Sequence, residues 1–212
     1  MKVLFLGTSD SPLVEYLKSV GDEVIATMDV IDVEFLNAHS PDFIVSYGYR
    51  HIIKKDVLDR YTDRAINLHI AYLPWNRGAD PNFWSFVEDT PKGVTIHYLD
   101  EGIDTGDIIA QRKVAFSETD TLRTSYNRLQ QEIQSLFKEH WADIRTGKCN
   151  REKQKGNGTH HRLKDKERLS HLLTNGWDTP ITVLDEYAAE TQMSMQFWEK
   201  YDAEIEQMRK QN

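Results

Sequence analysis

The feature that most constrains the fold is a series of short apolar segments separated by stretches of helical periodicity. The apolar segments are residues 2–6, 23–28, 43–48, 65–70, 93–99 and 107–115. Their length is typical of strands, and their lack of strict apolar–polar alternation indicates burial on both faces. Helical patterns between them predict an α/β fold: a Rossmann-like, mostly parallel sheet flanked by helices. The last two segments are joined by a loop without a helix, so we expect them to be antiparallel neighbours.

One long helix is predicted after these strands. Between residues 119 and 146, apolar side chains recur at three- and four-residue steps and give the helix one apolar face. Ser117 and Asp120 have the spacing of a capping box at its start, and Gly147 can supply the turn that ends it. We therefore divide the chain into a main domain at residues 1–146 and a C-terminal extension.

The extension, residues 147–212, has two unlike parts. Residues 148–168 hold eight Lys or Arg and three Asp or Glu, a net charge of +5 within a chain of net charge −8. This polar segment predicts loops, which are either solvated or form a local anion site. A final helical pattern carries Tyr187, Trp198, Tyr201, Ile205 and Met208. That apolar stripe either packs on the main domain or forms a two-fold interface.

Composition narrows the class of protein. Hydrophobic residues make up 39% of the chain and charged residues 28%, as in soluble globular proteins. The net negative charge argues against broad capture of nucleic acid, and no apolar run approaches the length of a membrane span. The apolar block before Gly7 is too short for a signal peptide. Cys149 is the only cysteine, so no internal disulfide can form and a cytoplasmic location is the default expectation.

Two polar side chains stand out in the fourth predicted strand. Asn67 and His69 are two positions apart, so they point to the same face of the strand. Pro74 and the Arg77–Gly78 turn follow, which places the pair at the carboxyl end of the strand. Ligands of open parallel sheets bind outside these ends. A catalytic or binding role and a structural role both remain open on this ground alone.

Two stretches of sequence carry a family resemblance. Residues 65–86 read AINLHIAYLPWNRGADPNFWSF, and residues 93–111 read GVTIHYLDEGIDTGDIIAQ. They contain, in order, Asn-x-His, Leu-Pro-x-x-Arg-Gly-x-x-Pro, Gly-Val-Thr-x-His and Asp-x-Gly. This series resembles the 10-formyltetrahydrofolate-dependent formyltransferases, clearly over residues 40–115 and consistently over 1–145. The resemblance implies a catalytic domain at residues 1–146, with 10-formyltetrahydrofolate as co-substrate and no metal.

The resemblance also implies a catalytic trio of Asn67, His69 and Asp104. Formyl transfer to an amine passes through a tetrahedral carbon that bears an oxyanion, and an amide or a protonated imidazole can donate to it. An imidazole, with an ordinary pKa near ~6.5, also suits the proton that the amine sheds. A carboxylate such as that of Asp104 can orient the imidazole and stabilise its charged form.

Other residues near the trio have alternative interpretations. His97, on the fifth predicted strand, is more often structural in such a position. Asp107 is also acidic, but the Asp-Thr-Gly match favours Asp104. A metal site built from His69, His97 and Asp104, or around His160, is disfavoured because neither set has tight ligand spacing.

The resemblance places the folate against the segment SYGYRHIIKKDVL and the loop at residues 99–104. In the family, backbone amides and carbonyls hold most of the pterin, which leaves few diagnostic side chains. We expect Tyr47, Gly48, Ile52 and Asp100 to contact the folate. Tyr47 is equally suited to a packed position in its strand.

The acceptor is the least defined partner. Methionyl-tRNA formyltransferases carry an additional C-terminal barrel, and ribonucleotide formyltransferases a glycine-rich phosphate loop after strand one. Neither feature is expected here. LPWNRGADPNFWSF and GNGTHHRLKD resemble instead the branch that formylates nucleotide-linked dideoxy-amino sugars for surface polysaccharide or O-antigen. We expect a 4-amino rather than a 3-amino acceptor, and thymidine, guanosine and uridine remain open as the nucleoside. The branch also implies a homodimer.

Four side chains are candidates for holding that acceptor. Arg77 can bind a phosphate through two parallel N–H donors. His160 and Lys164 lie in the basic segment, and Trp75 could stack on a base or a sugar, whereas Trp84 is expected in the core. Transfer to a different amine, on a ribonucleotide or an aminoacyl group, is one alternative. A non-catalytic folate- or nucleotide-binding module is the other.

Overall fold

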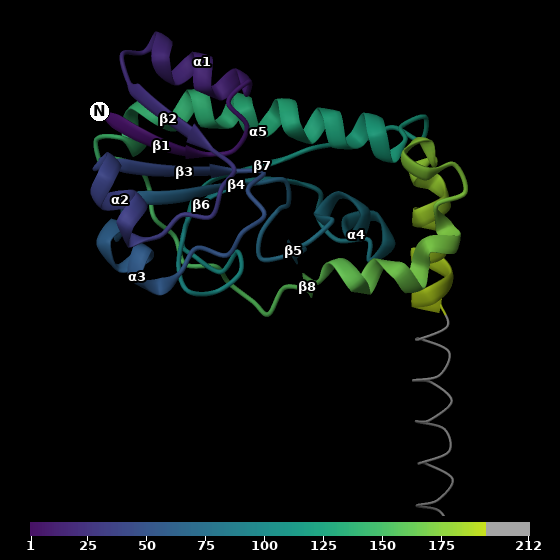
Figure 1. Cartoon of the computed structure of the whole chain (residues 1–212). Coiled ribbons are helices and arrows are strands. Elements are labelled where there is room, and N and C mark those ends of the chain that lie inside the picture. Colours follow the sequence, from purple (N-terminus) through teal and green to yellow (C-terminus); the bar gives the residue numbers. More distant parts are fainter. Residues whose placement is uncertain (194–212) are drawn as a thin grey trace, which may run out of the picture.

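The computed structural model describes residues 1–193, which build a six-stranded sheet (Figure 1). Its strands are β1 (Lys2–Leu6), β2 (Glu23–Thr27), β3 (Phe43–Tyr47), β4 (Ala65–His69), β6 (Gly93–Tyr98) and β7 (Ile108–Lys113). The spatial order is β2-β1-β3-β4-β6-β7, and the first four of these are mutually parallel. The predicted mostly parallel α/β sheet is confirmed, and so is the antiparallel pairing of β6 with β7.

One pairing differs from a simple alternating α/β pattern. β6 runs antiparallel to β4, although a helix lies between them in the chain. Tyr72–Asn76 turn the chain back on itself before that helix, and the Leu73–Pro74 peptide bond in this turn is cis. β6 begins at the end of the sheet where β4 ends, whereas a parallel crossover would carry the chain back to the end where β4 begins.

Helices cover both faces of the sheet (Figure 1). They are α1 (Pro12–Ser19), α2 (Val33–His39), α3 (Lys55–Leu58), α4 (Pro81–Val87) and α5 (Leu122–Ile144). α1 and α5 lie on one face, where Leu13 and Phe137 join one cluster of buried side chains. α2 and α3 lie on the other face, where Leu36 and Val57 join a second cluster. The sheet is thus buried on both sides, as its apolar strands require.

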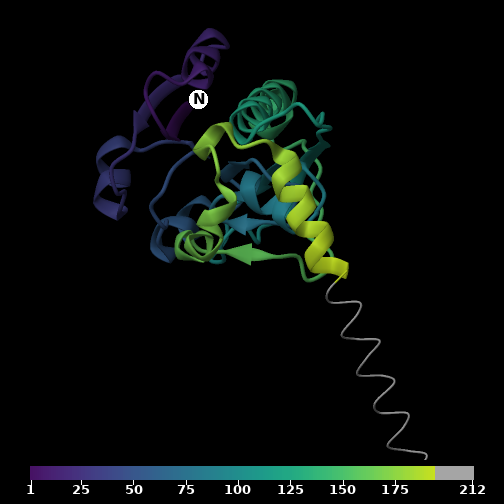
Figure 2. The ribbon, with the colours of Figure 1, turned by 90° about the vertical axis from the view of Figure 1, so that its right-hand side faces the viewer.

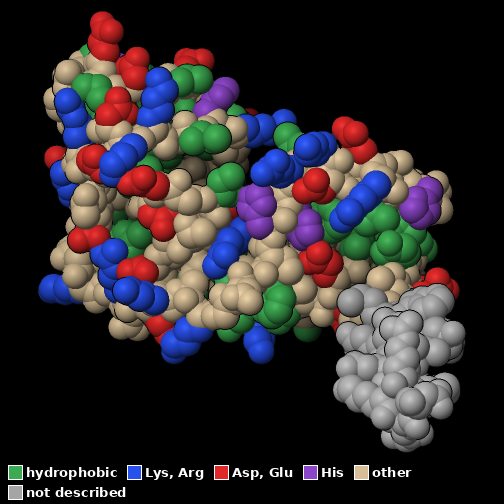
Figure 3. All heavy atoms as spheres, turned by 90° about the horizontal axis from the view of Figure 1, so that it is seen from below, with side chains coloured by type: hydrophobic (Ala, Val, Ile, Leu, Met, Phe, Trp, Pro, Cys, Tyr) green, Lys and Arg blue, Asp and Glu red, His purple; other side chains and the backbone are tan. Residues whose placement is uncertain are grey.

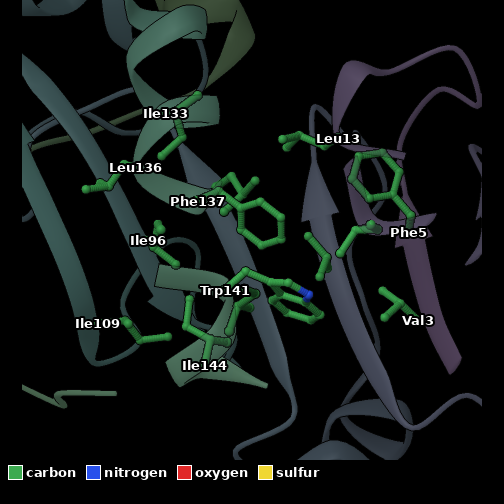
Figure 4. Close-up of a cluster of buried hydrophobic side chains, with 14 of the residues drawn as sticks. Val3, Phe5, Leu13, Ile96, Ile109, Ile133, Leu136, Phe137, Trp141 and Ile144 are labelled. Carbon is green, nitrogen blue, oxygen red and sulfur yellow. The ribbon is translucent and has the colours of Figure 1, made fainter. Parts of the chain in front are cut away.

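The apolar face of α5 supplies much of the larger cluster (Figure 4). Phe137 and Trp141 are fully or almost fully buried, at 0% and 1% exposure, and pack toward Phe5 and Ile96. The indole Nε1–H of Trp141 donates to Asp22 Oδ2 at 2.8 Å, so its polar atom is satisfied inside the core. This packing fixes α5 across the strands that carry the polar residues described below.

The start of α5 differs from the prediction by several residues. Thr121 is the N-cap: its hydroxyl accepts from the backbone N–H of Thr124, and the Thr124 hydroxyl accepts from the backbone N–H of Thr121, as in a capping box. Ser117 and Asp120 do bond, at 2.8 Å, but in the turn that precedes the helix. Gly147 has a φ of +68° beyond the end of α5, as predicted for a helix-ending turn.

The C-terminal extension returns to the main domain and lies along it (Figure 2). Its β8 (His160–His161) pairs in parallel with β5 (Arg77–Gly78) in a second, two-stranded sheet. The prediction of loops fails at Leu163–Leu172, which forms 3₁₀ turns because Leu169 and Leu172 are buried among α4 side chains. Residues 181–193 are helical.

Two further points concern the described residues. The predicted stripe of Trp198, Tyr201, Ile205 and Met208 lies outside them. No helix within residues 1–193 is both long and apolar enough to cross a membrane.

Candidate active site

Asn67 and His69 lie at the carboxyl end of β4, as predicted. β4 is flanked by β3 and β6, and the strand residues Ile66 and Leu68 are buried, with 0% and 4% exposure. His69 is itself 7% exposed. The register pairs Asn67 with His97 across the antiparallel β4–β6 ladder. Buried apolar neighbours thus hold the two polar side chains on one face, where they meet a loop from β6.

Asp104 lies on that loop, which joins β6 to β7, and the structure brings it to the strand pair. Its Oδ1 accepts from Asn67 Nδ2 at 3.1 Å, and its Oδ2 lies 3.8 Å from His69 Nδ1. The backbone N–H of Gly78 donates to Oδ2 at 2.8 Å. Asp104 has a φ of +53°, a left-handed conformation that Asp and Asn tolerate better than most residues. The three predicted residues therefore form one cluster.

The hydrogen bonds of His69 indicate which ring nitrogen can act as a base. Its Nε2 lies 3.0 Å from the carbonyl oxygen of Asn76, which can only accept. Nε2 therefore carries the proton, and Nδ1 holds the lone pair in the neutral ring. Nδ1 faces the carboxylate of Asp104, which can stabilise the imidazolium that forms when Nδ1 takes up a proton.

Asn67 is more constrained than its sequence suggested. Its Nδ2 donates to Asp104 and also lies 3.3 Å from His97 Nε2. His97 Nδ1 lies 2.8 Å from the carbonyl oxygen of Tyr98, so in the neutral ring Nδ1 carries the proton and Nε2 accepts from Asn67. Both N–H groups of the Asn67 amide are directed at protein atoms. Donation to an oxyanion, as predicted, requires one of these contacts to break.

His97 lies beside the predicted trio. It is 1% exposed, and its Nε2 lies 3.4 Å from Asp104 Oδ1. The sequence favours a structural role for a histidine that alternates with Val94 and Ile96 along a strand, and the hydrogen bonds of His97 fit that role. The β4–β6 register, which no local pattern reveals, is what brings it to Asn67.

Asp104 is held in its charged form. Burial alone raises the pKa of this carboxyl, but the two neighbouring imidazoles and the Gly78 N–H outweigh that effect. Together they hold the pKa well below its usual range. The carboxylate is therefore a fixed negative charge beside His69 at neutral pH.

The residues predicted to hold the folate lie near the cluster but are engaged in different ways. The Tyr47 hydroxyl donates to Gln130 and accepts from Gln134, so it is bonded to α5. Gly48 has a φ of +69° directly after β3. Asp100 Oδ1 accepts from Gly102 N and from the Thr105 hydroxyl within the loop of Asp104. Ile52 is 79% exposed.

The four predicted acceptor residues lie along β5, β8 and the turns around them. Arg77 is half-buried, and three of its five N–H groups are engaged: Nε and Nη2 donate to Gln154 Oε1, and Nη1 to the Asn157 carbonyl. Trp75 is 36% exposed, and His160 and Lys164 are exposed. The face along which β8 runs carries Lys, Arg and His side chains close to one another (Figure 3).

A hollow of about 120 Å³ lies beside the end of β4. Ile70, Phe83, Tyr126 and Trp177 form much of its wall, and the Asp80–Lys166 ion pair, at 3.1 Å, lies at its polar side. Aromatic walls with one charged pair suit a flat ring attached to a charged group. Trp84 is not part of this wall: it is 1% exposed and stacks on His161, a core position as predicted.

Within the part of the chain that the structure describes, no group of three or more His, Cys, Asp or Glu side chains could hold a metal ion. The side chains of the cluster supply a base, a carboxylate and hydrogen-bond donors. Such a set suits the transfer of a group to an amine, in which a proton must be removed.

Comparison with known proteins gives the site a family context. The model of the formyl transferase family (its N-terminal domain) matches residues 16–140, which include the whole cluster. The methionyl-tRNA formyltransferase of Finegoldia magna is 35% identical over 114 residues, 52% of this chain and 37% of that protein. The chain spans about a third to a half of the length of the curated relatives it matches.

Solved structures match over a larger share of the chain. The formyltransferase PseJ from Anoxybacillus kamchatkensis is 54% identical, with a TM-score of 0.85, and the match covers 89% of this chain and all of that one. PseJ was solved with UDP-4,6-dideoxy-4-formamido-L-AltNAc and tetrahydrofolate. A 4-N formyltransferase from Francisella tularensis is 22% identical with a TM-score of 0.70, covering 79% of this chain and 78% of that one, and shares the fold.

Proposed function

Since the chain belongs to the formyl transferase family, we propose that it moves the formyl group of 10-formyltetrahydrofolate to the amine of a nucleotide-linked amino sugar. The acceptor in this proposal is a UDP-linked 4-amino-4,6-dideoxy sugar. The product would be a 4-formamido sugar, a building block for surface polysaccharide. The observation that carries the proposal is the 54% identity to PseJ over 89% of this chain, and the cluster of Asn67, His69 and Asp104 supports it.

The geometry around His69 supports a base role in this transfer. A C–N bond forms between the sugar nitrogen and the formyl carbon, and the bond from that carbon to the folate N10 breaks. The amine loses a proton, which His69 Nδ1 accepts because its other nitrogen is committed to Asn76. The same proton can then pass to N10 of the departing folate. Asp104 stabilises the charged ring between these two steps.

Asn67 is proposed to donate to the oxygen of the formyl group as it gains charge. Its two N–H groups are directed at Asp104 and His97 in the unliganded protein. A formyl oxygen placed beside Nδ2 competes for one of them, and a donor to a developing oxyanion makes a stronger hydrogen bond than one to a neutral acceptor. The exchange costs little because the oxyanion replaces the lost partner.

The folate is proposed to lie against the exposed Ile52, Gly48 and the loop of Asp104. Covering an apolar side chain that is 79% exposed with a flat heterocycle removes apolar surface from water and so favours binding. For the acceptor, the hollow beside Ile70 offers aromatic walls to a nucleobase, and Lys166 an ammonium group to a phosphate. Arg77, Trp75, His160 and Lys164 remain predicted contacts on the same side of the chain.

Mass spectrometry tests the proposal directly. The purified protein is incubated with 10-formyltetrahydrofolate and a panel of nucleotide-linked 3-amino and 4-amino sugars with different nucleosides. We expect a mass gain of one formyl group on a UDP-linked 4-amino member, and no gain when the folate is omitted. A gain confined to a 3-amino sugar, a ribonucleotide amine or methionyl-tRNA would replace this acceptor with that one. No gain on any amine, with folate still bound, would indicate a binding module.

A further inference from the structure

A glutamine in the C-terminal extension holds the loop that carries Asp104. The amide nitrogen Nε2 of Gln154 donates to the backbone carbonyls of Asp104 and Gly106, both at 2.8 Å. These two carbonyls flank the bend of the loop between β6 and β7. Both N–H groups of one side chain are therefore used to fix the backbone on either side of the catalytic carboxylate.

The oxygen of the same glutamine fixes a second part of the site. Gln154 Oε1 accepts from Arg77 Nη2 at 2.7 Å and from Arg77 Nε at 3.1 Å. Arg77 lies in β5 next to Gly78, whose N–H donates to the Asp104 carboxylate. One amide thus links the loop of Asp104 to the strand that holds its carboxylate, and every polar atom of that amide has a partner.

A second residue of the extension supports His69 in the same indirect way. The hydroxyl of Thr159 accepts from the backbone N–H of Asn76 at 2.9 Å and donates to its side-chain oxygen at 3.3 Å. Asn76 is fully buried, and its carbonyl receives the Nε2–H of His69. Thr159 therefore fixes the residue that determines which nitrogen of His69 is free.

The backbone of the extension runs in direct contact with the site. A Cβ atom at Gly158 would lie 2.0 Å from the carbonyl oxygen of Pro74, and one at Gly78 would lie 2.3 Å from that of His161. Only glycine allows such an approach, and both have a positive φ. Glu152 and Ile108 exchange two backbone hydrogen bonds at the other end of the segment. We call residues 152–161, bounded by these contacts, the strap.

From these contacts we infer that the strap is a positioning element of the reaction, with Gln154 orienting Asp104 and Thr159 orienting His69. Neither side chain touches the reacting atoms. Gln154 acts through the backbone of Asp104, and Thr159 acts through Asn76, whose carbonyl holds His69. The inference rests on the formyl transfer proposed above. It assigns Gln154 and Thr159 a role in the rate of the chemical step, separate from the substrate contacts proposed for His160 and Lys164.

The first test is a pair of substitutions at Gln154. Gln154→Leu removes all four contacts, and Gln154→Glu keeps an oxygen for Arg77 but sets a carboxylate oxygen against two carbonyls. We expect kcat to fall about 10-fold to 100-fold in both, with each KM changed less than about threefold, since misplacement of a catalytic group affects the transition state. The control is Gln131→Glu, the same change of charge at an exposed glutamine on α5. The inference is overturned if both Gln154 variants keep kcat within twofold of the parent.

The second test does not depend on the acceptor. The Gly78 amide proton is bonded to the Asp104 carboxylate, so its exchange with solvent reports whether that carboxylate is in place. By NMR of the full chain without substrates, we expect Gln154→Leu to speed exchange at Gly78 about tenfold, while amides in β1 and β3 are unchanged. Unchanged Gly78 exchange would refute the role of Gln154 in orienting Asp104. If the parent protein formylates no amine at all, the proposed function fails. The Gly78 exchange rates of the parent and of Gln154→Leu still decide whether Gln154 holds Asp104 in place.

Thr159 offers a rescue experiment that a purely structural role would not show. Thr159→Val keeps the shape but leaves the Asn76 N–H without its acceptor, and Thr159→Ser restores the hydroxyl. We expect kcat to fall about tenfold in the valine variant and to return to within about twofold in the serine variant, at matched folded fractions. Equal kcat in the two variants would remove Thr159 from the assignment.

Discussion

The two halves of the candidate site are held in place by different means. Asn67 and His69 lie on a strand buried on both faces, between Ile66 and Leu68 and the cores above and below them. Asp104 lies on a loop whose position depends on hydrogen bonds from Gly78 and from the strap. Packing is non-directional and tolerant, whereas a hydrogen bond fixes distance and angle. Packing thus fixes the strand that carries the base, and directional hydrogen bonds fix the carboxylate that orients the base.

The largest expected effect on kcat comes from replacing His69, the proposed base on strand β4. Replacing His69 by Asn removes the proposed base while keeping a side chain that can accept a hydrogen bond. We expect kcat to fall by about 10²–10⁴-fold, the range for loss of a general base, with the thermal midpoint little changed. The control is His171→Asn, at an exposed histidine of the extension. Activity within tenfold of the parent would mean that another group accepts the proton.

The next largest effect on kcat comes from replacing Asp104, the carboxylate on the loop. Asp104→Asn keeps the shape of the side chain but removes the charge that stabilises protonated His69. We expect kcat to fall by about 10²-fold, at the lower end of that range, because His69 itself remains. The matched control is Asp107→Asn, three residues further along, whose carboxylate bonds Arg151 instead. A larger loss at Asp107 than at Asp104 would reverse the assignment made from the motif.

The same variant also gives a stability test with a defined sign. The folded protein lowers the pKa of Asp104, so the ionised carboxylate adds stability above its ordinary pKa near ~3.9, and this contribution is lost as pH falls toward the folded value. Urea unfolding between pH 6 and pH 2.5 should show a steeper loss of stability for the parent than for Asp104→Asn. Parallel curves would mean that the carboxylate gains nothing from its partners.

A smaller effect, on stability, tests the contrast between packing of the strand and hydrogen bonding of the loop. Ile66→Val deletes one methylene from the fully buried neighbour of Asn67 and should cost about 1 kcal/mol of unfolding free energy. Urea titration measures this cost, and kcat per folded molecule should stay within about twofold. The Gln154 variants should show the opposite result: kcat falls, and the free energy of unfolding changes little. If Ile66→Val lowers kcat as Gln154→Leu does, the strand is as sensitive to small displacements as the loop.

The smallest effect concerns the exposed apolar residue on the proposed folate side. Ile52→Ser removes surface that the folate would cover, and we expect its KM to rise about threefold with stability unchanged. Steady-state kinetics with varied folate measures this, and Val30→Ser, at another exposed apolar position, is the control. An unchanged KM would place the folate elsewhere.

Much of the fold was predictable because buried strands carry a local signal. The predicted runs at residues 2–6, 43–48 and 65–70 contain β1, β3 and β4, and the helical period located α5. The antiparallel direction of β6 was not predictable, since the turn that reverses the chain depends on how the residues after His69 pack. β5 and β8 are two residues long, too short for any period to show.

The site divides in the same way. Asn67, His69 and Asp104 were found because a family motif fixes their order and spacing. The contacts of Gln154 and Thr159 reach backbone groups 48 to 83 residues away in sequence, and a backbone partner leaves no trace in residue identity. Tyr47 shows the reverse difficulty, because its hydroxyl is bonded to α5 and the sequence could not tell packing from ligand contact.

The pairing of β5 with β8 has a consequence for the order in which the molecule assembles. Asn76 and Thr159, which bond at this junction, are 83 residues apart in the chain. Closing a loop of that length costs entropy that a few hydrogen bonds repay only after the sheet has formed. We therefore expect the sheet and α5 to fold first, and catalytic competence to be acquired in a separate, later kinetic phase. During synthesis, a nascent chain would bury its core well before it could turn over its first substrate.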